Sequence, residues 1–427
     1  MTPPTTPPPS GQATTTQITW AWGSNAHIDF NAATDKLDFG WFQASQFTIS
    51  EVNGSVVISI PTNHQTYTLD DTRLADLDLA NIIAKDTSAL NVWATALGET
   101  VGAPQPPTTP PVTPPTTPPV GPPVDSDPTR EFSPYIDMAM PRAADLLAIS
   151  QASGIDNFTL AFVLGSSQGI GWQGTGTIAD DTLSNGTTIL QQVQAIQAAG
   201  GNITISFGGA AGQEAALMAT SAAQLQAQYQ SVIDRYQIDS IDFDIEGWAT
   251  QHARSIDIRG DAIRGLQEAN PDLQVSFTLP VLPTGLAADG LAVLRSAMQD
   301  GVRIDVVNIM AMDYGPAVNN GGQMGLNAIL AAEATQAQLA AIGLDAQIGI
   351  TPMIGVNDVV SEVFTLADAQ MLLDYAANDP DVARLSMWSV LRDNGNGAGS
   401  PWASPEHSGV SQGPYDYAEI LQQFDVL

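Results

Sequence analysis

The stretch DSIDFDIE at residues 239–246 decides the fold of this chain. Successive side chains of a β-strand face opposite sides, so Asp242, Asp244 and Glu246 share one face while isoleucine and phenylalanine fill the other. A strand so apolar on one face is buried there, and we expect its acidic face to be enclosed as well. The alternative is an edge strand with solvated acids, but this strand lies mid-domain between helical stretches.

Three carboxyl groups enclosed on one strand repel one another, and this is costly unless at least one of them holds a proton. Carboxyl groups whose pKa values are pushed apart in this way carry out proton transfer in enzymes. The stretch therefore predicts proton-transfer chemistry as well as a central strand.

Short apolar strands alternate with Ala-, Leu- and Gln-rich helical stretches through residues 131–427. We expect eight strands, at 135–138, 159–164, 203–207, 240–245, 274–279, 306–312, 347–351 and 385–390. Helices are expected between them, including 187–199, 215–236, 328–342 and a last one at 415–424. Eight strand–helix units predict an α/β fold, the (β/α)₈ or TIM barrel. The alternative is an open doubly wound sheet, but no phosphate-binding or GxGxxG loop supports it.

Two proline- and threonine-rich tracts divide the chain, at residues 1–16 and 103–130. Such tracts form extended, semi-rigid spacers. Between them, residues 17–102 predict a small β-rich domain, with a hairpin at Asn53-Gly54. Trp20, Trp22 and Trp41 are either its core or a sugar-stacking surface. The Asp-Phe-Asn sequence of this domain, at residues 29–31, is similar to the closing segment of calcium-binding secreted repeat proteins. The glycine-rich repeats of those proteins are missing, so we do not expect bound calcium.

The composition excludes several classes of function. The 427 residues carry 45 acids against 13 bases, a formal net charge of −32, and such a surface repels nucleic acid and anionic membranes. The chain has no cysteine, and its four histidines lack metal-ligand spacing, so we expect neither a metal nor a cofactor. No apolar run approaches the roughly 18 residues of a membrane span. A monomer that acts on a neutral polymer fits this composition.

Residues 239–246 match the pattern D-x-x-D-x-D-x-E, in which four acids are fixed within eight positions. Upstream, Ser206, Gly208 and Gly209 form an S-x-G-G motif after an apolar strand, and Trp388 stands near the end of the chain. In identity, order and spacing these features resemble family 18 glycoside hydrolases, the chitinases and their relatives. The resemblance covers roughly residues 131–427.

The resemblance implies a substrate-assisted mechanism, in which the 2-acetamido oxygen of the sugar attacks the anomeric carbon with net retention. Glu246, nearest the rim of the barrel, would be the general acid and later the base. Asp244 would orient the acetamide N–H, and Asp242 would share a proton with Asp244, which turns between partners. Asp239 has the opposite parity and is expected to be structural, and Ser206 would support the acids inside the barrel.

The sixth expected strand departs from the family pattern M-x-Y-D. Met310 and Asp313 match it, but Met312 stands where the family has tyrosine. Tyr314 shares the pleat parity of the two methionines and is a candidate to supply the missing hydroxyl. Met310 and Met312 themselves are candidate contacts to substrate, although plain barrel packing is the favoured interpretation. The departure resembles a bacterial branch similar to chitinase D.

Several other residues are candidate sugar contacts. Trp388 would form the floor beneath the reacting sugar, and Trp172, in a glycine-rich loop, would either bind a neighbouring sugar or anchor that loop. Weaker candidates are Gln213, Trp248 and Trp402. Ser206 has no nearby histidine–aspartate pair, so a serine hydrolase is rejected.

These observations predict a secreted chitinase that cleaves β-1,4 bonds between N-acetylglucosamine units. The proline–threonine tracts resemble linkers of secreted polysaccharide-degrading enzymes, and a chain that opens inside a linker suggests that a signal peptide was removed. Two alternatives use the same barrel. One is an endo-β-N-acetylglucosaminidase acting on glycoprotein glycans, and the other is a non-catalytic chitin-binding lectin. The lectin is disfavoured because such relatives lose the terminal Glu or the middle Asp, which this chain keeps.

Overall fold

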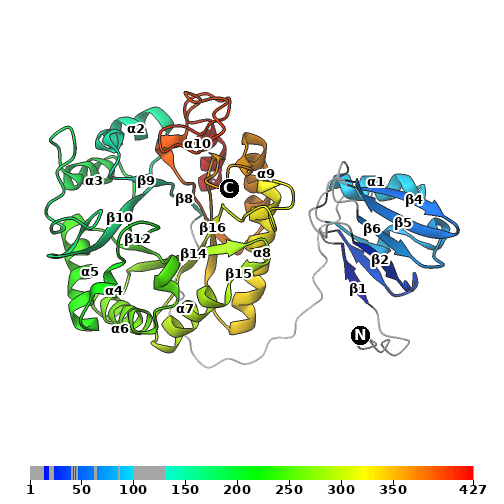
Figure 1. Ribbon diagram of the computed structural model, residues 1–427, viewed down its shortest axis with the longest axis horizontal. Helices are drawn as coiled ribbons and strands as arrows, with labels where there is room; N and C mark the ends of the chain where they lie inside the picture. The colour runs from blue at the N-terminus through cyan, green and yellow to red at the C-terminus, as the bar shows by residue number, and fades with distance from the viewer. Residues whose placement is uncertain are drawn as a thin grey trace, which may run out of the picture. The chain divides into compact units, whose positions relative to one another are not determined.

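The computed structural model describes residues 14–18, 24–39, 42, 44, 47–61, 65–84, 87–99 and 130–426. The chain divides into two compact units, Met1–Pro123 and Val124–Leu427, and each is described by itself (Figure 1). Within the described residues no helix is long and apolar enough to cross a membrane.

The smaller unit is built from two sheets and a helix. One sheet has the order β2-β6-β5-β4 and the other β1-β3-β7. The strands are β1 (Thr15–Gln17), β2 (Asn25–Ile28), β3 (Lys36–Asp38), β4 (Thr48–Val52), β5 (Ser55–Ile60), β6 (Gln65–Leu69) and β7 (Ile82–Ile83). Helix α1 (Thr87–Leu97), which sequence reasoning did not predict, follows β7. Trp20, Trp22 and Trp41 lie outside the described residues.

The hairpin expected at Asn53-Gly54 is confirmed. Strands β4 and β5 pair in antiparallel register on either side of the two turn residues. The turn residues have φ angles of 52° and 83°, both in the left-handed region. Asn and Gly reach this region more easily than other residues, and two such residues in succession match the twist of the flanking strands.

Trp93 on α1 is the largest buried side chain among the described residues of the smaller unit. It is fully buried, and its ring meets Phe39 edge to face at 5.6 Å. Phe39 in turn contacts Phe47 at 4.7 Å. An aromatic cluster of this kind supplies a large share of the burial available to a unit of this size.

We therefore expect Trp93→Ala to destabilise the smaller unit by about 3–5 kcal/mol, because it leaves a cavity that the fold cannot close. Differential scanning calorimetry should show one transition lowered and that of the barrel unchanged. The control is Trp402→Ala, since the Trp402 side chain is 67% exposed. Equal loss in both transitions would contradict the independence of the two cores.

The larger unit is the expected (β/α)₈ barrel. Its strands pair in parallel in the order β10, β12, β13, β14, β16, β17, β20 and β8. Strands β8 and β9 are two consecutive pieces of one segment, and because β8 pairs β20 while β9 pairs β10, they close the barrel. The strands are β8 (Glu131–Phe132), β9 (Tyr135–Asp137), β10 (Phe158–Ser166), β12 (Ile203–Gly208), β13 (Ser240–Asp244), β14 (Gln274–Leu282), β16 (Val306–Ala311), β17 (Gln347–Pro352) and β20 (Val382–Leu385).

Helices surround these strands, as Figure 1 shows for α5, α6 and α8. They are α2 (Leu146–Ser153), α3 (Ile189–Ala198), α4 (Ala215–Met218), α5 (Ala222–Tyr236), α6 (Ala253–Ala269), α7 (Ala288–Gln299), α8 (Met324–Ile342), α9 (Leu366–Asn378) and α10 (Asp416–Leu421). Short strands β11 (Gly169–Trp172), β15 (Gly285–Leu286), β18 (Gly355–Val356) and β19 (Val363–Phe364) lie in loops.

Two expected elements differ from those observed. The helix expected over 215–236 is two helices, because Ser221 caps α5 and accepts a hydrogen bond from the Gln224 amide. The last strand was expected at 385–390 but lies at Val382–Leu385. Residues beyond it leave the regular ladder, although Trp388 still bridges to Tyr135 and Met353 on the neighbouring strands.

Candidate active site

The register of three neighbouring strands places the acidic residues of β13. Asp242 lies between Ser206 of β12 and Ser276 of β14, and Asp244 lies between Gly208 and Thr278. Small and hydroxyl-bearing residues therefore flank both acids inside the barrel. The alternation predicted from DSIDFDIE is confirmed, since Ile241, Phe243 and Ile245 are fully buried in the apolar layer.

Asp242 is fully buried and accepts four hydrogen bonds. One oxygen accepts from the hydroxyls of Ser206 at 2.6 Å and Tyr135 at 3.0 Å. The other accepts from the hydroxyls of Ser276 at 2.6 Å and Thr278 at 2.7 Å. A buried carboxyl is costly unless it is hydrogen-bonded, and here both oxygens are satisfied without a cation in direct contact.

The four hydroxyls belong to a larger polar network. The Tyr135 hydroxyl lies 2.8 Å from that of Thr278, and Asn308 donates to both. Asn308 in turn accepts from Thr351 at 2.9 Å. Burial, followed by the charges of Asp242 and Asp244, raises the pKa of Tyr135 well above its usual value, so this phenol remains a donor.

Asp244 and Glu246 share a hydrogen bond at the mouth of the barrel. Burial is the main cause that raises the pKa of Asp244 well above its usual value, and the charges of Glu246 and Asp242 add to it. Burial also raises the pKa of Glu246, the bond from Asp244 lowers it, and Asp313 raises it. These directions make Asp244 the protonated donor of the pair. Its Oδ1 atom is buried without a partner among the described residues.

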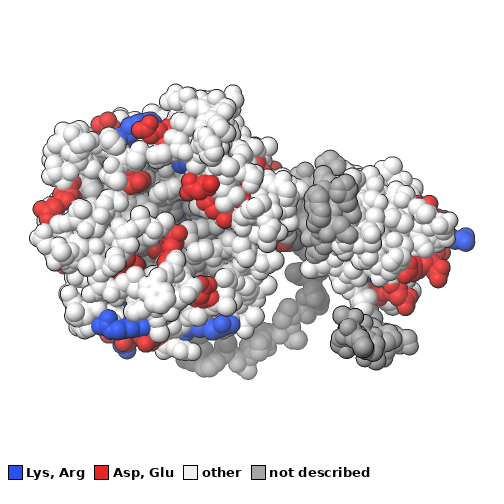
Figure 2. Space-filling view, in the orientation of Figure 1, with Lys and Arg blue, Asp and Glu red and all other residues white. Residues whose placement is uncertain are grey.

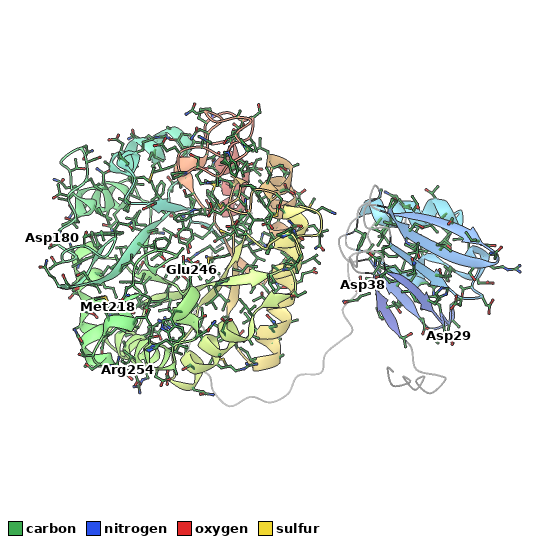
Figure 3. All side chains as sticks on the ribbon, viewed as in Figure 1. Asp29, Asp38, Asp180, Met218, Glu246 and Arg254 are labelled. Carbon is green, nitrogen blue, oxygen red and sulfur yellow. The ribbon has the colours of Figure 1, made fainter. Side chains whose placement is uncertain are left out.

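A pocket with a volume of about 210 Å³ opens above this pair. Figure 2 shows a hollow in this face of the barrel with acidic side chains at its edge, and in Figure 3 Glu246 lies toward the middle of the barrel. The lining residues are Tyr135, Phe162, Ala210, Asp244, Glu246, Thr278, Met310, Met312, Asp313, Thr351, Met353, Asp358 and Trp388. The lining contains four carboxyl groups and no basic side chain.

An aromatic wall forms one side of the pocket. Trp388 is half-buried, and its ring stacks on that of Phe162 at 5.7 Å with an interplanar angle of 20°. Gly209 approaches the same Phe162 ring so closely that a Cβ atom would lie 2.7 Å from it. Gly208 has a φ angle of 108°, and a Cβ there would meet the Asp244 carbonyl oxygen. Both glycines of the S-x-G-G motif are therefore required by close contacts with the site.

The sequence matches a known family over this same unit. The model of glycosyl hydrolases family 18 matches residues 133–363, more than half of the chain. The chain belongs to this family.

Several relatives of this family member are named chitinases. A probable bifunctional chitinase/lysozyme of Escherichia coli (strain K12) is 33% identical over 318 residues, which cover 70% of this chain and 35% of that protein. Endochitinase 11 of Metarhizium anisopliae is 33% identical over 291 residues, covering 62% and 53%. The chain therefore spans less than two thirds of the length of these relatives.

A solved structure covers the barrel more completely. The catalytic domain of the hyperthermophilic chitinase from Pyrococcus furiosus is 35% identical, with a TM-score of 0.61. The similarity covers 70% of this chain and 95% of that one. It spans the barrel and its loops, so the fold assignment of this family 18 member rests on sequence and structure together.

The structure brings most of the sequence-predicted residues to the pocket. Glu246, Asp244, Asp313, Trp388, Met310 and Met312 line it, and Asp242, Ser206, Gly208 and Gly209 support it from within the barrel. The two methionines are half-buried and face the pocket, so simple barrel packing does not describe them. Asp239 is exposed, and its carbonyl accepts from the Gln274 amide at the other end of the strand.

Two candidate sugar contacts do not offer a side chain to the pocket, and for Trp172 the structure favours the alternative role of a loop anchor. Trp172 is buried, and its indole N–H donates to the Tyr236 hydroxyl at 2.7 Å, so it anchors β11 to α5 and has no face for a sugar. Tyr314 is also buried and does not line the pocket. Asp313 has a φ angle of 51°, which breaks the strand alternation and turns Tyr314 away from the methionines.

The remaining candidates lie outside the pocket. Gln213 is exposed, and its backbone carbonyl accepts a hydrogen bond from the Gly165 amide. Trp248 and Trp402 are 65% and 67% exposed. Trp248 lies two residues after Glu246, in a short 3₁₀ helix at Gly247–Thr250, and its ring lies 5.6 Å from that of His252.

Sequence reasoning missed several lining residues. Tyr135 and Phe162 stand on β9 and β10, where a count of inward-facing positions on every strand would have singled them out. Met353 and Asp358 lie in the loop after β17, whose path no periodicity reveals. Among the described residues no cluster of His, Asp or Glu is arranged to hold a metal ion.

We expect Tyr135→Phe to cost about 1–3 kcal/mol of stability, because it removes a donor to Asp242 and an acceptor for Asn308. It should also lower the turnover rate, since the acids lose part of their support. Denaturant unfolding and an activity assay measure both. The control is Tyr229→Phe, whose buried hydroxyl bonds Glu214 at 3.4 Å outside the pocket. Unchanged turnover in Tyr135→Phe would contradict this role.

Tyr314→Phe should leave activity unchanged and raise stability slightly. The Tyr314 hydroxyl is buried and has no hydrogen-bond partner among the described residues, so its removal relieves a desolvation cost. Thermal unfolding and initial rates give the two readouts. A large loss of activity would restore Tyr314 as a substrate contact.

Proposed function

We propose that this protein is a chitinase that hydrolyses β-1,4 bonds between N-acetylglucosamine units by substrate-assisted, retaining catalysis. The observation that carries the proposal is the hydrogen-bonded pair of Asp244 and Glu246 at a pocket walled by Trp388. The chitinase names of the relatives that cover the barrel support the substrate class.

Glu246 protonates the glycosidic oxygen of the leaving sugar. Burial raises the pKa of Glu246 and so favours the protonated form that general acid catalysis requires. After the leaving sugar departs, the carboxylate of Glu246 takes a proton from the incoming water. Glu246 is half-buried, so it can reach both the sugar and the solvent.

Asp244 does not act as the nucleophile in this mechanism. It is hydrogen-bonded to Glu246 itself, whereas a nucleophilic carboxylate must lie about 5 Å or more from the acid, across the reacting bond. The acetamido oxygen of the substrate attacks the anomeric carbon instead and forms an oxazolinium ion. Asp244 turns its hydrogen bond from Glu246 to the acetamide N–H.

Asp242 keeps the turning carboxyl in place. All four of its hydrogen bonds come from hydroxyl groups, which reorient at little cost. When Asp244 turns inward, a hydroxyl can rotate and leave room for a shared proton between the two acids. The hydrogen bond between Asp244 and Glu246 supports this step, because Glu246 is one of the two partners that the step requires.

The chain carries this activity in residues 131–427, and residues 17–102 serve as an accessory domain on a proline–threonine linker. We place the protein outside the cell, where insoluble polysaccharide is found. The linkers and the acidic surface, which does not bind anionic polymers, support this placement.

Glu246→Gln should lower the turnover of an N-acetylglucosamine hexamer by about 10²–10⁴-fold, because the amide cannot donate the catalytic proton. The hexamer should still bind. The matched control is Asp239→Asn, which removes an exposed acid from the same motif. Near wild-type rates in Glu246→Gln would contradict the mechanism.

The stereochemistry of the products tests the rest of the proposal. Anomer-resolved chromatography should show cleavage of the acetamido hexamer with β-anomer products, and no cleavage of a cellulose hexamer. The α-anomer would indicate inversion. Binding without cleavage would favour the lectin, and cleavage of a glycoprotein glycan alone would favour the endo-β-N-acetylglucosaminidase.

A further inference from the structure

A buried carboxyl group lies behind the pocket and has no part in the mechanism above. Glu362 follows the loop after β18 and is fully buried. Its oxygens accept from the backbone amides of Tyr314 at 3.0 Å and Gly315 at 2.8 Å, and from the Asn319 side chain at 3.1 Å. No described cation forms an ion pair with it. All three donors belong to the loop after β16, which also contains Asp313.

The loops after β16 and β17 are joined by reciprocal hydrogen bonds, in which each loop donates to a carboxylate of the other. Glu362 binds the β16 loop, while the Asp313 carboxylate of that loop accepts from the Val359 amide at 2.8 Å. Asn357 adds a longer contact from the Asp313 amide at 3.4 Å and is itself tied to the carbonyls of Met353 and Gly355. The two loops therefore form one unit at the pocket.

We propose that Glu362 is a positioning residue of the active site, which holds the backbone after Asp313 and so fixes the Asp313 carboxylate in the pocket beside Glu246. A left-handed residue such as Asp313 reverses the chain sharply, at a cost for any side chain other than glycine. Glu362 binds the two amides that follow this reversal. Among the described residues, no other group accepts a hydrogen bond from these two amides.

The position of Asp313 affects the proton on Glu246. Glu246 faces Asp244 from its own strand and Asp313 from the β16 loop, and the charge of Asp313 raises the pKa of Glu246. Asp313 in turn faces Asp358 and Glu362 from the β17 loop and Arg392 from the segment after β20. Burial first, and then Asp358 and Glu362, raise the pKa of Asp313, while the Val359 amide and Arg392 lower it.

The sign of the pH effect follows from these charges. Glu246 acts in its protonated form, so kcat/KM falls as the pH rises through the pKa of Glu246. If Asp313 moves away, its charge no longer raises that pKa. The alkaline limb of the pH profile, in which kcat/KM falls with rising pH, then moves to lower pH.

The decisive variant is Glu362→Gln, which preserves shape but leaves only one oxygen to accept hydrogen bonds. Its NH₂ group then meets an amide donor of Tyr314 or Gly315, so the loop shifts. This prediction rests on the proposed chitinase activity, and kcat/KM for the N-acetylglucosamine hexamer should fall by about 10–100-fold, as expected for a displaced active-site group. The alkaline limb should move to lower pH.

Four further variants separate positioning from general destabilisation. Asp313→Asn should move the alkaline limb in the same direction, and the double variant should move it no further. Asn319→Ala removes one donor to Glu362 and should give a smaller shift of the same sign in a chain that folds. Asp181→Asn is the control. Asp181 is a buried acid that accepts from the Leu190 amide and from Tyr236 outside the pocket, so the limb should not move.

Amide hydrogen exchange tests the same inference without substrate. Exchange at Tyr314 and Gly315 should be faster in Glu362→Gln than in the parent protein and the Asp181→Asn control. An unmoved alkaline limb in both Glu362→Gln and Asn319→Ala, despite faster exchange, would overturn the inference. If the parent protein cleaves no hexamer, the proposed function fails, and unchanged exchange in Glu362→Gln would separately show that Glu362 does not hold the loop.

Discussion

The burial of the Asp242 carboxyl inside the barrel is the constraint on which the rest of the site depends. A carboxyl without solvent needs partners on every side, and a strand in a barrel has neighbours on both edges and across the interior. Ser206 and Ser276 supply them from the adjacent strands, and Tyr135 reaches across from β9. The middle of this barrel is therefore polar, where a barrel core is ordinarily filled by branched apolar side chains. Replacing these hydroxyls with apolar residues would leave Asp242 without partners.

Depth along one strand separates the three acids. Asp242 is fully buried and fully hydrogen-bonded, Asp244 is 4% exposed with one oxygen unpartnered, and Glu246 is half-buried at the rim. Both oxygens of Asp242 already accept two hydrogen bonds each, so this acid has no capacity to bind substrate. Asp244 has a free acceptor and a proton, so it can exchange one partner for another. Only Glu246 reaches solvent. One strand with alternating acids therefore produces three different chemical environments, because each pleat moves a carboxyl closer to the mouth of the barrel.

The sequence predicted those parts of the site that follow from regular periodicity. The alternation in DSIDFDIE placed the acids on one face, and the barrel and the Asn53-Gly54 hairpin followed from local patterns. The expectation that Trp388 lies at the site came from the family resemblance. Failures occurred where the chain leaves regular structure. Tyr314 was assigned by strand parity, which the left-handed φ of Asp313 interrupts. For Trp172 the sequence left the sugar contact and the loop anchor open, because the anchoring partner Tyr236 lies 64 residues away and no local pattern reveals it. Asp358 and Glu362 lie in a loop whose path depends on long-range hydrogen bonds.

The negative charge of the pocket lining also fits the proposed reaction, in which positive charge develops. Four carboxyl groups and no basic side chain line it, so its field favours positive charge at its centre. Substrate-assisted cleavage develops positive charge on the sugar ring and then on the oxazolinium ion. Arg392 lies behind Asp313, but its guanidinium is buried and its Nη2 donates to the carbonyls of Ile354 and Val356. Burial lowers the pKa of Arg392 to about 10, so the cation persists near neutral pH and limits the repulsion between Asp313 and Asp358. Because Arg392 lies outside the lining, it stabilises these acids without adding positive charge to the pocket wall.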